Sequence, residues 1–204
     1  MTIIIKPGHT VEFIGDSITD CDRLDDLELG LGDGYVRLIA DTLRPLGIHV
    51  INRGISGNRS ADLVTRWRND CLDLAPDVLS IMIGINDTWR RFDSGDPTST
   101  EVFEDNYRKL LNATVSELRA QIVLIEPWLL PASPDQQAWR QDLDPKIEVV
   151  GRLAAEFGLT LLPLDAILQR QAETDTGAAL AADGVHPTAH GHQIIAQAWL
   201  NLTR

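Results

Sequence analysis

The amino-acid sequence predicts an α/β fold, in which residues 1–204 form a single three-layer α/β/α domain around a parallel sheet of about five strands. The first observation is that short apolar runs alternate along the chain with segments whose apolar residues have helical spacing. The second is that these runs are rich in β-branched residues and apolar on both faces, as expected of strands covered by helices on both sides. Such alternation implies right-handed βαβ units, and therefore parallel strands.

The individual elements can be placed in chain order from these patterns. Strands are expected at residues 10–15, 49–52, 78–85, 122–126 and 159–164. Helices, each with one apolar stripe, are expected at residues 34–44, 60–74, 101–119, 144–157 and 188–203. The order resembles that of flavodoxin-like sheets, in which ligands bind at the carboxyl ends of the strands. The two longest loops, 21–33 and 89–100, each follow a motif at a strand end and are expected to rim that crevice.

Composition and charge exclude several classes of protein. Apolar residues make up 44% of the chain and charged residues 24%, which is ordinary for a soluble globular protein. The formal net charge of −12 disfavours nucleic acid and anionic membrane surfaces as partners. The sequence has no apolar stretch long enough to cross a bilayer and no signal-peptide features at its N-terminus, so we expect a cytoplasmic protein. Cys21 and Cys71 are the only cysteines, too few for a disulfide framework, and are expected to be free thiols.

Ser17 follows the run FIGD, at the expected end of the first strand. A serine at this point can present its hydroxyl to the crevice as a nucleophile, and a helix N-terminus beside it favours negative charge. The alternative is that Asp16 or Ser17 simply caps a helix, a role that both residue types fill well. Thr19 stands where a G-x-S-x-G nucleophile elbow needs its second glycine, which argues against the common α/β-hydrolase fold.

Asp183 and His186 lie three residues apart, immediately before Pro187. The residue before a proline is kept out of the helical region, so we expect His186 in extended backbone ahead of the last helix. A short turn would let Asp183 accept a hydrogen bond from one imidazole nitrogen while the other nitrogen faces the serine, as a general base requires. The alternative is a loop histidine that only bonds a backbone carbonyl.

The segment HPTAHGH also raises the question of a metal site, because His186, His190 and His192 are close in sequence. His186 is expected to lie outside the last helix, and no nearby cysteine or carboxylate cluster completes a set of zinc ligands at conventional spacing. We therefore expect neither a metal nor another cofactor, with His190 and His192 packed in the protein or facing solvent.

Gly54 and Asn86 follow the second and third expected strands, in NRGISGN and MIGIND. A serine hydrolase must hold the oxyanion of a tetrahedral intermediate, and losing one hydrogen-bond donor to it costs about 3 kcal/mol. Gly54 offers a backbone N–H with no Cβ to block approach, and Asn86 offers a side-chain amide. The alternatives are a turn glycine and an Asx-turn. Asn52, Asn58 and Asp87 are expected to brace these loops.

Together, FIGDSITD, NRGISGN, MIGIND and ADGVHP resemble the four motif blocks of the SGNH hydrolase superfamily, also called the GDSL esterases and lipases. The resemblance runs from Phe13 to the C-terminal helix. It implies a serine esterase in which Ser17 is the nucleophile, His186 the base and Asp183 its partner. In that family the oxyanion hole combines the nucleophile's own N–H with a glycine and an asparagine, which are Gly54 and Asn86 here.

The residues around the motifs resemble those of the SGNH acetylxylan esterases in particular. The similar segments are FIGDSITDC, SIMIGINDTWR and the VHP…GH ending. This resemblance implies an intracellular-type enzyme that removes O-acetyl groups from carbohydrates such as xylo-oligosaccharides. Trp89 then either stacks on a sugar ring or packs in the protein, and Asp16 and Val185 are further expected substrate contacts.

The same resemblance implies a homo-oligomer. The apolar segment Trp128, Leu129 and Leu130 stands between two prolines and either seats a partner subunit or ends a buried strand.

Three functions are compatible with these residues. The first is a cofactor-free esterase in which Ser17 forms an acyl-enzyme and His186 is the general base. The second keeps this triad but acts on a lysophospholipid, a thioester or a general short-chain ester, although the polar loops after Ser17 and Asn86 favour small acyl groups. The third is a non-catalytic flavodoxin-like binding module for a nucleotide or flavin, but the first turn lacks a Gly-rich phosphate loop.

Overall fold

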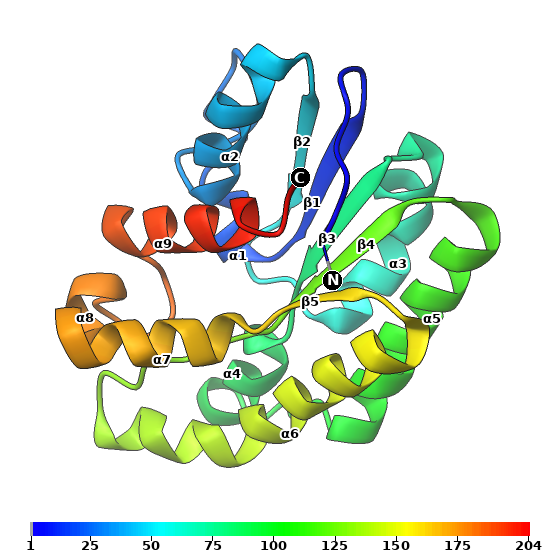
Figure 1. Ribbon diagram of the computed structural model, residues 1–204. Coiled ribbons are helices and arrows are strands. Elements are labelled where there is room, and N and C mark those ends of the chain that lie inside the picture. Colours follow the sequence, from blue (N-terminus) through cyan, green and yellow to red (C-terminus); the bar gives the residue numbers. More distant parts are fainter. Residues whose placement is uncertain (1) are drawn as a thin grey trace.

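The computed structural model describes residues 2–204, and five parallel strands form its central sheet (Figure 1). The strands are β1 (Thr10–Gly15), β2 (His49–Gly54), β3 (Val78–Met82), β4 (Gln121–Ile125) and β5 (Thr160–Leu162). Their order across the sheet is β2-β1-β3-β4-β5, and every neighbouring pair is parallel. The predicted α/β class and parallel sheet are therefore confirmed, with the flavodoxin-like strand order.

Helices cover both faces of this sheet. Consecutive residues of β1 show the two layers, because Phe13 belongs to one hydrophobic cluster and Ile14 to the other. On the Phe13 side pack α2 (Tyr35–Leu43), α7 (Leu164–Asp175), the short α8 (Gly177–Leu180) and α9 (Ala189–Leu200). On the Ile14 side pack α3 (Ser60–Asp70), α5 (Thr100–Glu117) and most of α6 (Pro134–Phe157). Short 3-10 turns at Arg44–Leu46 and Leu72–Leu74 follow α2 and α3.

The third strand is shorter than the sequence predicts, and a helix replaces part of an expected loop. β3 ends at Met82, and α4 (Ile85–Asp93) begins only three residues later. The break lies at Gly84, whose φ of 140° no strand or helix residue adopts. Ile83 and Ile85 on either side are both buried, so the apolar pattern runs on past the end of the strand. Consequently Trp89 lies on a helix and not in the predicted loop 89–100.

The sixth helix begins earlier than predicted, at Pro134 instead of residue 144. Ser133 caps it by accepting a hydrogen bond from the Gln136 N–H at 3.2 Å, and Pro134 occupies the first turn, where a missing N–H costs nothing. Pro145 lies inside the helix, where a proline usually interrupts the pattern. The helix α7 was not predicted at all.

The apolar segment after β4 belongs to the core. Trp128, Leu129 and Leu130 are 1%, 0% and 5% exposed. The suggestion that this segment seats a partner subunit is therefore wrong, because its side chains are already buried in the larger hydrophobic cluster, together with residues of α7 and α9.

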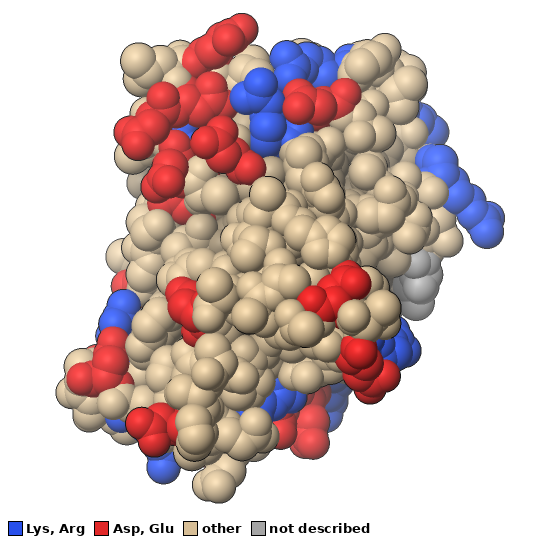
Figure 2. All heavy atoms as spheres, turned by 90° about the vertical axis from the view of Figure 1, so that its left-hand side faces the viewer, with Lys and Arg blue, Asp and Glu red and all other residues tan. Residues whose placement is uncertain are grey.

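The surface is uneven in charge. Figure 2 shows the face that carries α2 and α9, and acidic side chains gather there at the end near α2. A broad uncharged area separates them from smaller groups of charged side chains below. The segment 21–33, which precedes α2, contributes five acidic residues to the sequence: Asp22, Asp25, Asp26, Glu28 and Asp33. Within residues 2–204, no helix combines the length and the apolar character needed to cross a membrane.

Candidate active site

Ser17 is the first residue of the short helix α1 (Ser17–Asp20), directly after β1. Asp16 is the N-cap of this helix, and its carboxylate accepts a hydrogen bond from the Ile18 N–H at 3.1 Å. Asp16 is only 1% exposed, and burial raises the pKa of its carboxyl group to about 7. The expected substrate contact at Asp16 does not fit this position, because the carboxyl is buried as a cap beneath the serine.

The structure brings Ser17, His186 and Asp183 into one chain of hydrogen bonds. Ser17 Oγ lies 3.0 Å from His186 Nε2, and His186 Nδ1 lies 2.6 Å from Asp183 Oδ2. An ionised carboxylate only accepts, so Nδ1 carries the proton and Nε2 is left free to accept the serine proton. This is the arrangement of a nucleophile, a general base and the group that orients the base.

Asp183 is held as an anion by the turn it belongs to. Its Oδ1 accepts hydrogen bonds from the backbone N–H groups of Val185 at 2.9 Å and His186 at 2.7 Å. Partial burial works to raise the pKa of Asp183, but the bonds from His186 and Val185 hold it below its ordinary value. The carboxylate therefore stays ionised at neutral pH and can stabilise an imidazolium.

The start of α6 clamps the same turn. Gln136 Nε2 donates to the Asp183 carbonyl at 2.8 Å, while Gln136 Oε1 accepts from the Ala132 N–H at 2.8 Å. The Leu130 N–H also donates to the Gly184 carbonyl, at 2.9 Å. Val185 inside this turn is 1% exposed, so its side chain is part of the core and the predicted substrate contact does not fit.

Asn86 occupies the second position of α4, at the carboxyl end of β3. Its Nδ2 donates one hydrogen bond to the Asn58 carbonyl at 3.1 Å. A primary amide has two donor hydrogens, so the second remains for an oxyanion. Asn58 in turn fixes the orientation of the amide.

Gly54 is a glycine for a packing reason. A Cβ at this position would lie 2.1 Å from the Asp20 backbone nitrogen, because the end of β2 packs directly against α1. Its N–H already donates to Asn52 Oδ1 at 2.8 Å. The expected role of Gly54 as an oxyanion donor therefore does not fit the structure, since a backbone N–H committed to a neighbour is not free for the substrate.

Gly57 is better placed than Gly54 to offer a free backbone N–H to a substrate in the cleft. Its backbone φ of 82° favours glycine, and among residues 2–204 no group accepts a hydrogen bond from its N–H. Ser56, the residue before it, lines the same cleft as Ser17 and His186, and Asn58, the residue after it, accepts from Asn86. The Ser17 N–H at the start of α1 is likewise without an acceptor in the described part of the chain.

The cleft at Ser17 and His186 is lined by both polar and apolar side chains. Its lining residues are Ser17, Ile18, Cys21, Asp22, Ser56, His186, Pro187 and His192. The predicted loop 21–33 thus supplies part of the wall. Trp89, on α4, stands beside the base, with its ring centroid 5.9 Å from that of His186, and it also packs on Trp139 at 5.4 Å.

Hydrogen bonds hold the loops around this cleft, as predicted for Asn52, Asn58 and Asp87. Asn52 Nδ2 donates to the carbonyls of Thr19 at 2.6 Å and Leu31 at 2.8 Å. Asp87 accepts from both the hydroxyl and the N–H of Ser60, at 2.6 and 2.9 Å.

Asp20 is a brace that the sequence analysis missed. Its Oδ2 accepts from the N–H and the hydroxyl of Ser56, at 3.0 and 2.9 Å. It thereby ties the loop that contains Gly57 to the helix that contains Ser17.

The three histidines of the HPTAHGH segment diverge. His192 Nδ1 accepts from the Tyr35 N–H at 3.1 Å, at the start of α2, and burial lowers the pKa of its imidazole to about 4. His190 Nε2 instead lies 2.9 Å from Asp175 Oδ2 on α7. Across residues 2–204, no three His, Cys, Asp or Glu side chains gather in a way that could hold a metal ion.

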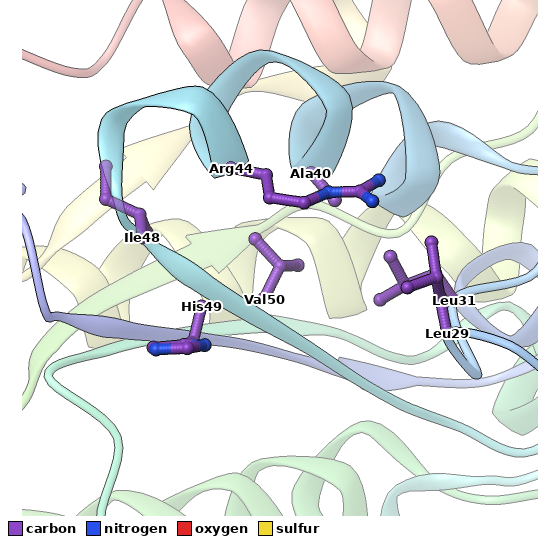
Figure 3. Close-up of a pocket in the computed structure, with 7 residues that line it drawn as sticks. All are labelled: Leu29, Leu31, Ala40, Arg44, Ile48, His49 and Val50. Atoms are coloured by element: carbon purple, nitrogen blue, oxygen red, sulfur yellow. The ribbon is translucent and has the colours of Figure 1, made fainter.

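A second hollow lies away from the triad, at the outer strand β2 (Figure 3). It is lined by Leu29, Leu31, Ala40, Arg44, Ile48, His49 and Val50. Figure 3 shows the Arg44 side chain extended past Val50 with its guanidinium toward Leu31. The hollow holds no nucleophile beside a base, so the chemistry belongs to the cleft at Ser17.

Comparisons with known proteins place the chain in a family. Residues 13–194 match the model of the GDSL-like Lipase/Acylhydrolase family. The chain is 38% identical over 207 aligned residues to an acetylxylan esterase from Geobacillus stearothermophilus, covering 96% of this chain and 94% of that protein.

Solved structures give the same result. The crystal structure of the Geobacillus stearothermophilus acetylxylan esterase superposes with a TM-score of 0.88 at 36% identity, over 97% of this chain and 95% of that one. Catalytic mutants of that esterase replace a serine, an aspartate or a histidine by alanine. A GDSL-like lipase described as putative, from Parabacteroides merdae, reaches 0.93 at 34% identity, over 99% and 98% of the two chains.

These matches span nearly the whole chain and include all the segments that build the cleft. They favour an enzyme over a non-catalytic flavodoxin-like module. The chain belongs to the GDSL-like lipase/acylhydrolase family of the SGNH hydrolases and is a serine carboxylic-ester hydrolase.

Proposed function

We propose that the chain removes O-acetyl groups from carbohydrates such as xylo-oligosaccharides, through an acyl-enzyme on Ser17. The observation that carries the mechanism is the hydrogen-bonded series from Ser17 through His186 to Asp183. The similarity to an acetylxylan esterase, one structure of which is described as an acetyl-xylooligosaccharide esterase, supports the substrate class.

In the first half of the reaction, Ser17 Oγ attacks the acetyl carbonyl carbon and His186 Nε2 takes the serine proton. Asp183 stabilises the imidazolium through Nδ1. The tetrahedral intermediate then collapses, and His186 gives its proton to the departing sugar oxygen. This leaves an acetyl group on Ser17 and a free sugar hydroxyl.

In the second half, a water molecule loses a proton to His186 and attacks the acetyl group. The resulting intermediate releases acetate, and His186 returns the proton to Ser17 Oγ. No metal or organic cofactor enters this scheme, because the three side chains account for every proton that moves.

We assign the oxyanion hole to the N–H groups of Ser17 and Gly57 and the Nδ2 group of Asn86. Gly57 replaces Gly54 in this assignment, because the Gly54 N–H already bonds Asn52. Asn86→Ala should lower kcat about 100- to 1,000-fold in a 4-nitrophenyl acetate assay, the usual loss for one oxyanion donor. The exposed Asn112→Ala on α5 is the matched control and should retain full activity. An Asn86→Ala enzyme with normal kcat would contradict the assignment.

The surroundings of Ser17 support a small acyl group. Asp22, Ser56 and His192 bring polar atoms to the cleft, whereas a long acyl chain needs an apolar groove. The net charge of −12 supports an uncharged partner over nucleic acid or an anionic membrane. Both cysteines are free thiols, which fits the cytoplasmic location that we propose. The homo-oligomer stays a prediction from the resemblance.

The experiment that tests the proposal is acetate release from acetylated xylo-oligosaccharides, run beside 4-nitrophenyl acetate and octanoate. We expect the wild type to deacetylate the sugar and 4-nitrophenyl acetate but not to hydrolyse the octanoate. Both acetate-releasing activities should be lost in Ser17→Ala. Preference for octanoate would instead support the alternative of a lysophospholipase with the same triad. Full activity in Ser17→Ala would overturn the mechanism.

A further inference from the structure

Aromatic side chains form a row that leads away from the catalytic histidine. The Trp89 ring lies 5.9 Å from the His186 ring, and Trp139 on α6 lies 5.4 Å from Trp89. Phe92 stacks on Trp139, with centroids 5.5 Å apart and an interplanar angle of 14°. The row therefore starts at the base and ends at Phe92.

Helix geometry sets the direction of this row. Trp89 and Phe92 are three residues apart on α4, so they share one side of the helix and are displaced by about 4.5 Å along its axis. Trp139 packs against both rings from α6 and fixes their spacing.

The middle ring of this row is buried, whereas the last ring, Phe92, is exposed to solvent. Trp139 is 8% exposed, whereas Phe92 is 40% exposed. A single exposed apolar residue is common and needs no explanation by itself. Phe92, however, lines a surface hollow with Arg91, Ala138, Gln141 and Asp142, so its exposed edge faces a concave and partly polar place.

The polar groups in this hollow are suited to sugar hydroxyls. The Arg91 Cζ lies 5.9 Å from the Phe92 ring centroid, and Arg91 Nη1 donates to Asp142 Oδ1 at 2.9 Å. Gln141 adds an amide that can donate and accept. A pyranose presents C–H groups on its faces and hydroxyls at its edge, which matches an aromatic edge bordered by the planar donors of Arg91 and Gln141. Asp142 holds Arg91 in place, since its other oxygen is already bonded by Lys146.

We propose that Phe92, Arg91 and Gln141 form a second sugar subsite, which binds a pyranose residue of the same oligosaccharide beyond the residue whose acetyl group meets Ser17. This inference rests on the proposed carbohydrate esterase function. The subsite makes the enzyme favour acetylated oligosaccharides over acetylated monosaccharides, because a monosaccharide held at Ser17 has no second sugar residue to bind at Phe92.

The test is the chain-length selectivity of the enzyme, defined as kcat/KM on acetylated xylotetraose divided by kcat/KM on acetylated xylose. Phe92→Ala should lower this ratio about three- to tenfold, the range for the loss of one aromatic contact. Phe92→Tyr, which keeps a ring, should retain most of it. Val115→Ala is the matched control, because Val115 is 50% exposed near the end of α5 and lines neither the cleft at Ser17 nor the hollow at Phe92.

A binding measurement makes the result independent of turnover. In the Ser17→Ala background, calorimetric titration with unacetylated xylotetraose should show weaker binding once Phe92→Ala is added, while binding of xylose should not change. Unchanged selectivity and unchanged affinity in Phe92→Ala, with a wild type that deacetylates xylotetraose, would overturn the subsite and leave the esterase proposal standing. A wild type inactive on every acetylated sugar would overturn both.

Discussion

Two carboxyl groups, one on the turn before His186 and the other inside the first strand, have pKa values shifted in opposite directions. Asp183 has a side chain that is 50% exposed, yet it accepts three hydrogen bonds and its pKa lies below the ordinary value. Glu12, inside β1, is 0% exposed, and within residues 2–204 neither of its oxygens has a hydrogen-bond partner. Burial raises the pKa of Glu12 to about 8, against the opposing charge of Arg53.

The comparison shows that donors aimed at a carboxylate keep it ionised, and that burial without donors makes it hold a proton. The ionised group stands at the carboxyl ends of the strands, where the reaction needs a negative charge beside His186. The protonated group stands in the core, where its ionisation would only weaken the fold. Three changes test this contrast.

The largest effect is expected from Asp183→Asn. An amide in place of the carboxylate keeps the shape but cannot stabilise the imidazolium, and its NH₂ group favours the wrong tautomer of His186. We expect kcat/KM on 4-nitrophenyl acetate to fall roughly 10,000-fold with little change in Tm. The control is Asp175→Asn, since Asp175 also bonds a histidine, His190, but outside the cleft. Equal losses in the two variants would contradict the role of Asp183.

The second carboxyl group of the comparison, the buried Glu12, is tested by the substitution Glu12→Gln. The unfolded chain ionises Glu12 near pH 4.5, whereas the folded protein holds the proton up to about pH 8. Ionisation therefore favours the unfolded state increasingly from pH 4.5 to pH 8, and glutamine removes this penalty. We expect Glu12→Gln to raise the free energy of unfolding by about 3 kcal/mol at pH 7, with no gain below pH 4.5.

Urea unfolding at a series of pH values measures this gain. The exposed Glu28→Gln removes the same formal charge from the surface loop and should change stability by less than about 0.5 kcal/mol at every pH. A pH-independent effect of Glu12→Gln would mean that packing, and not ionisation, distinguishes the two side chains.

The smallest effect is expected from Gln136, which holds the turn that carries Asp183. Gln136→Ala removes the bonds to the Asp183 carbonyl and to the Ala132 N–H, so the triad is held less firmly. We expect about a tenfold fall in kcat on 4-nitrophenyl acetate with KM unchanged, since the acyl cleft is not touched. Gln136→Glu separates the two bonds, because its carboxylate still accepts from Ala132 but cannot donate to Asp183. Normal kcat in Gln136→Glu would show that the Asp183 bond does not position the triad.

The strands and the hydrogen-bonded series from Ser17 through His186 to Asp183 could be predicted from sequence because their signals are local. The run TVEFIG ends at a glycine followed by Asp16, and β1 has the predicted bounds. Asp183 and His186 are close in the chain and precede a proline, so a turn alone places them together. The α4 helix was missed because its apolar neighbours Ile83 and Ile85 extend the strand pattern across Gly84.

The choice between Gly54 and Gly57 could not be made from NRGISGN, because both glycines look free in the sequence. Only the folded chain shows that Asn52 takes the Gly54 N–H and that α1 packs on Gly54. Val185 is a similar case, because its position beside the base says nothing about its burial. Partners that are distant in the chain, such as Gln136 and Asp20, leave no local signal at all.

The most direct test of the account is to locate the acetyl group during turnover. The enzyme would be quenched in acid while it hydrolyses 4-nitrophenyl acetate, digested and analysed by mass spectrometry. We predict one acetyl group on the peptide that contains Ser17, at the Ser17 side chain, and none in Ser17→Ala. Acetyl found on Cys21, which lines the same cleft, and not on Ser17 would contradict a mechanism built on Ser17.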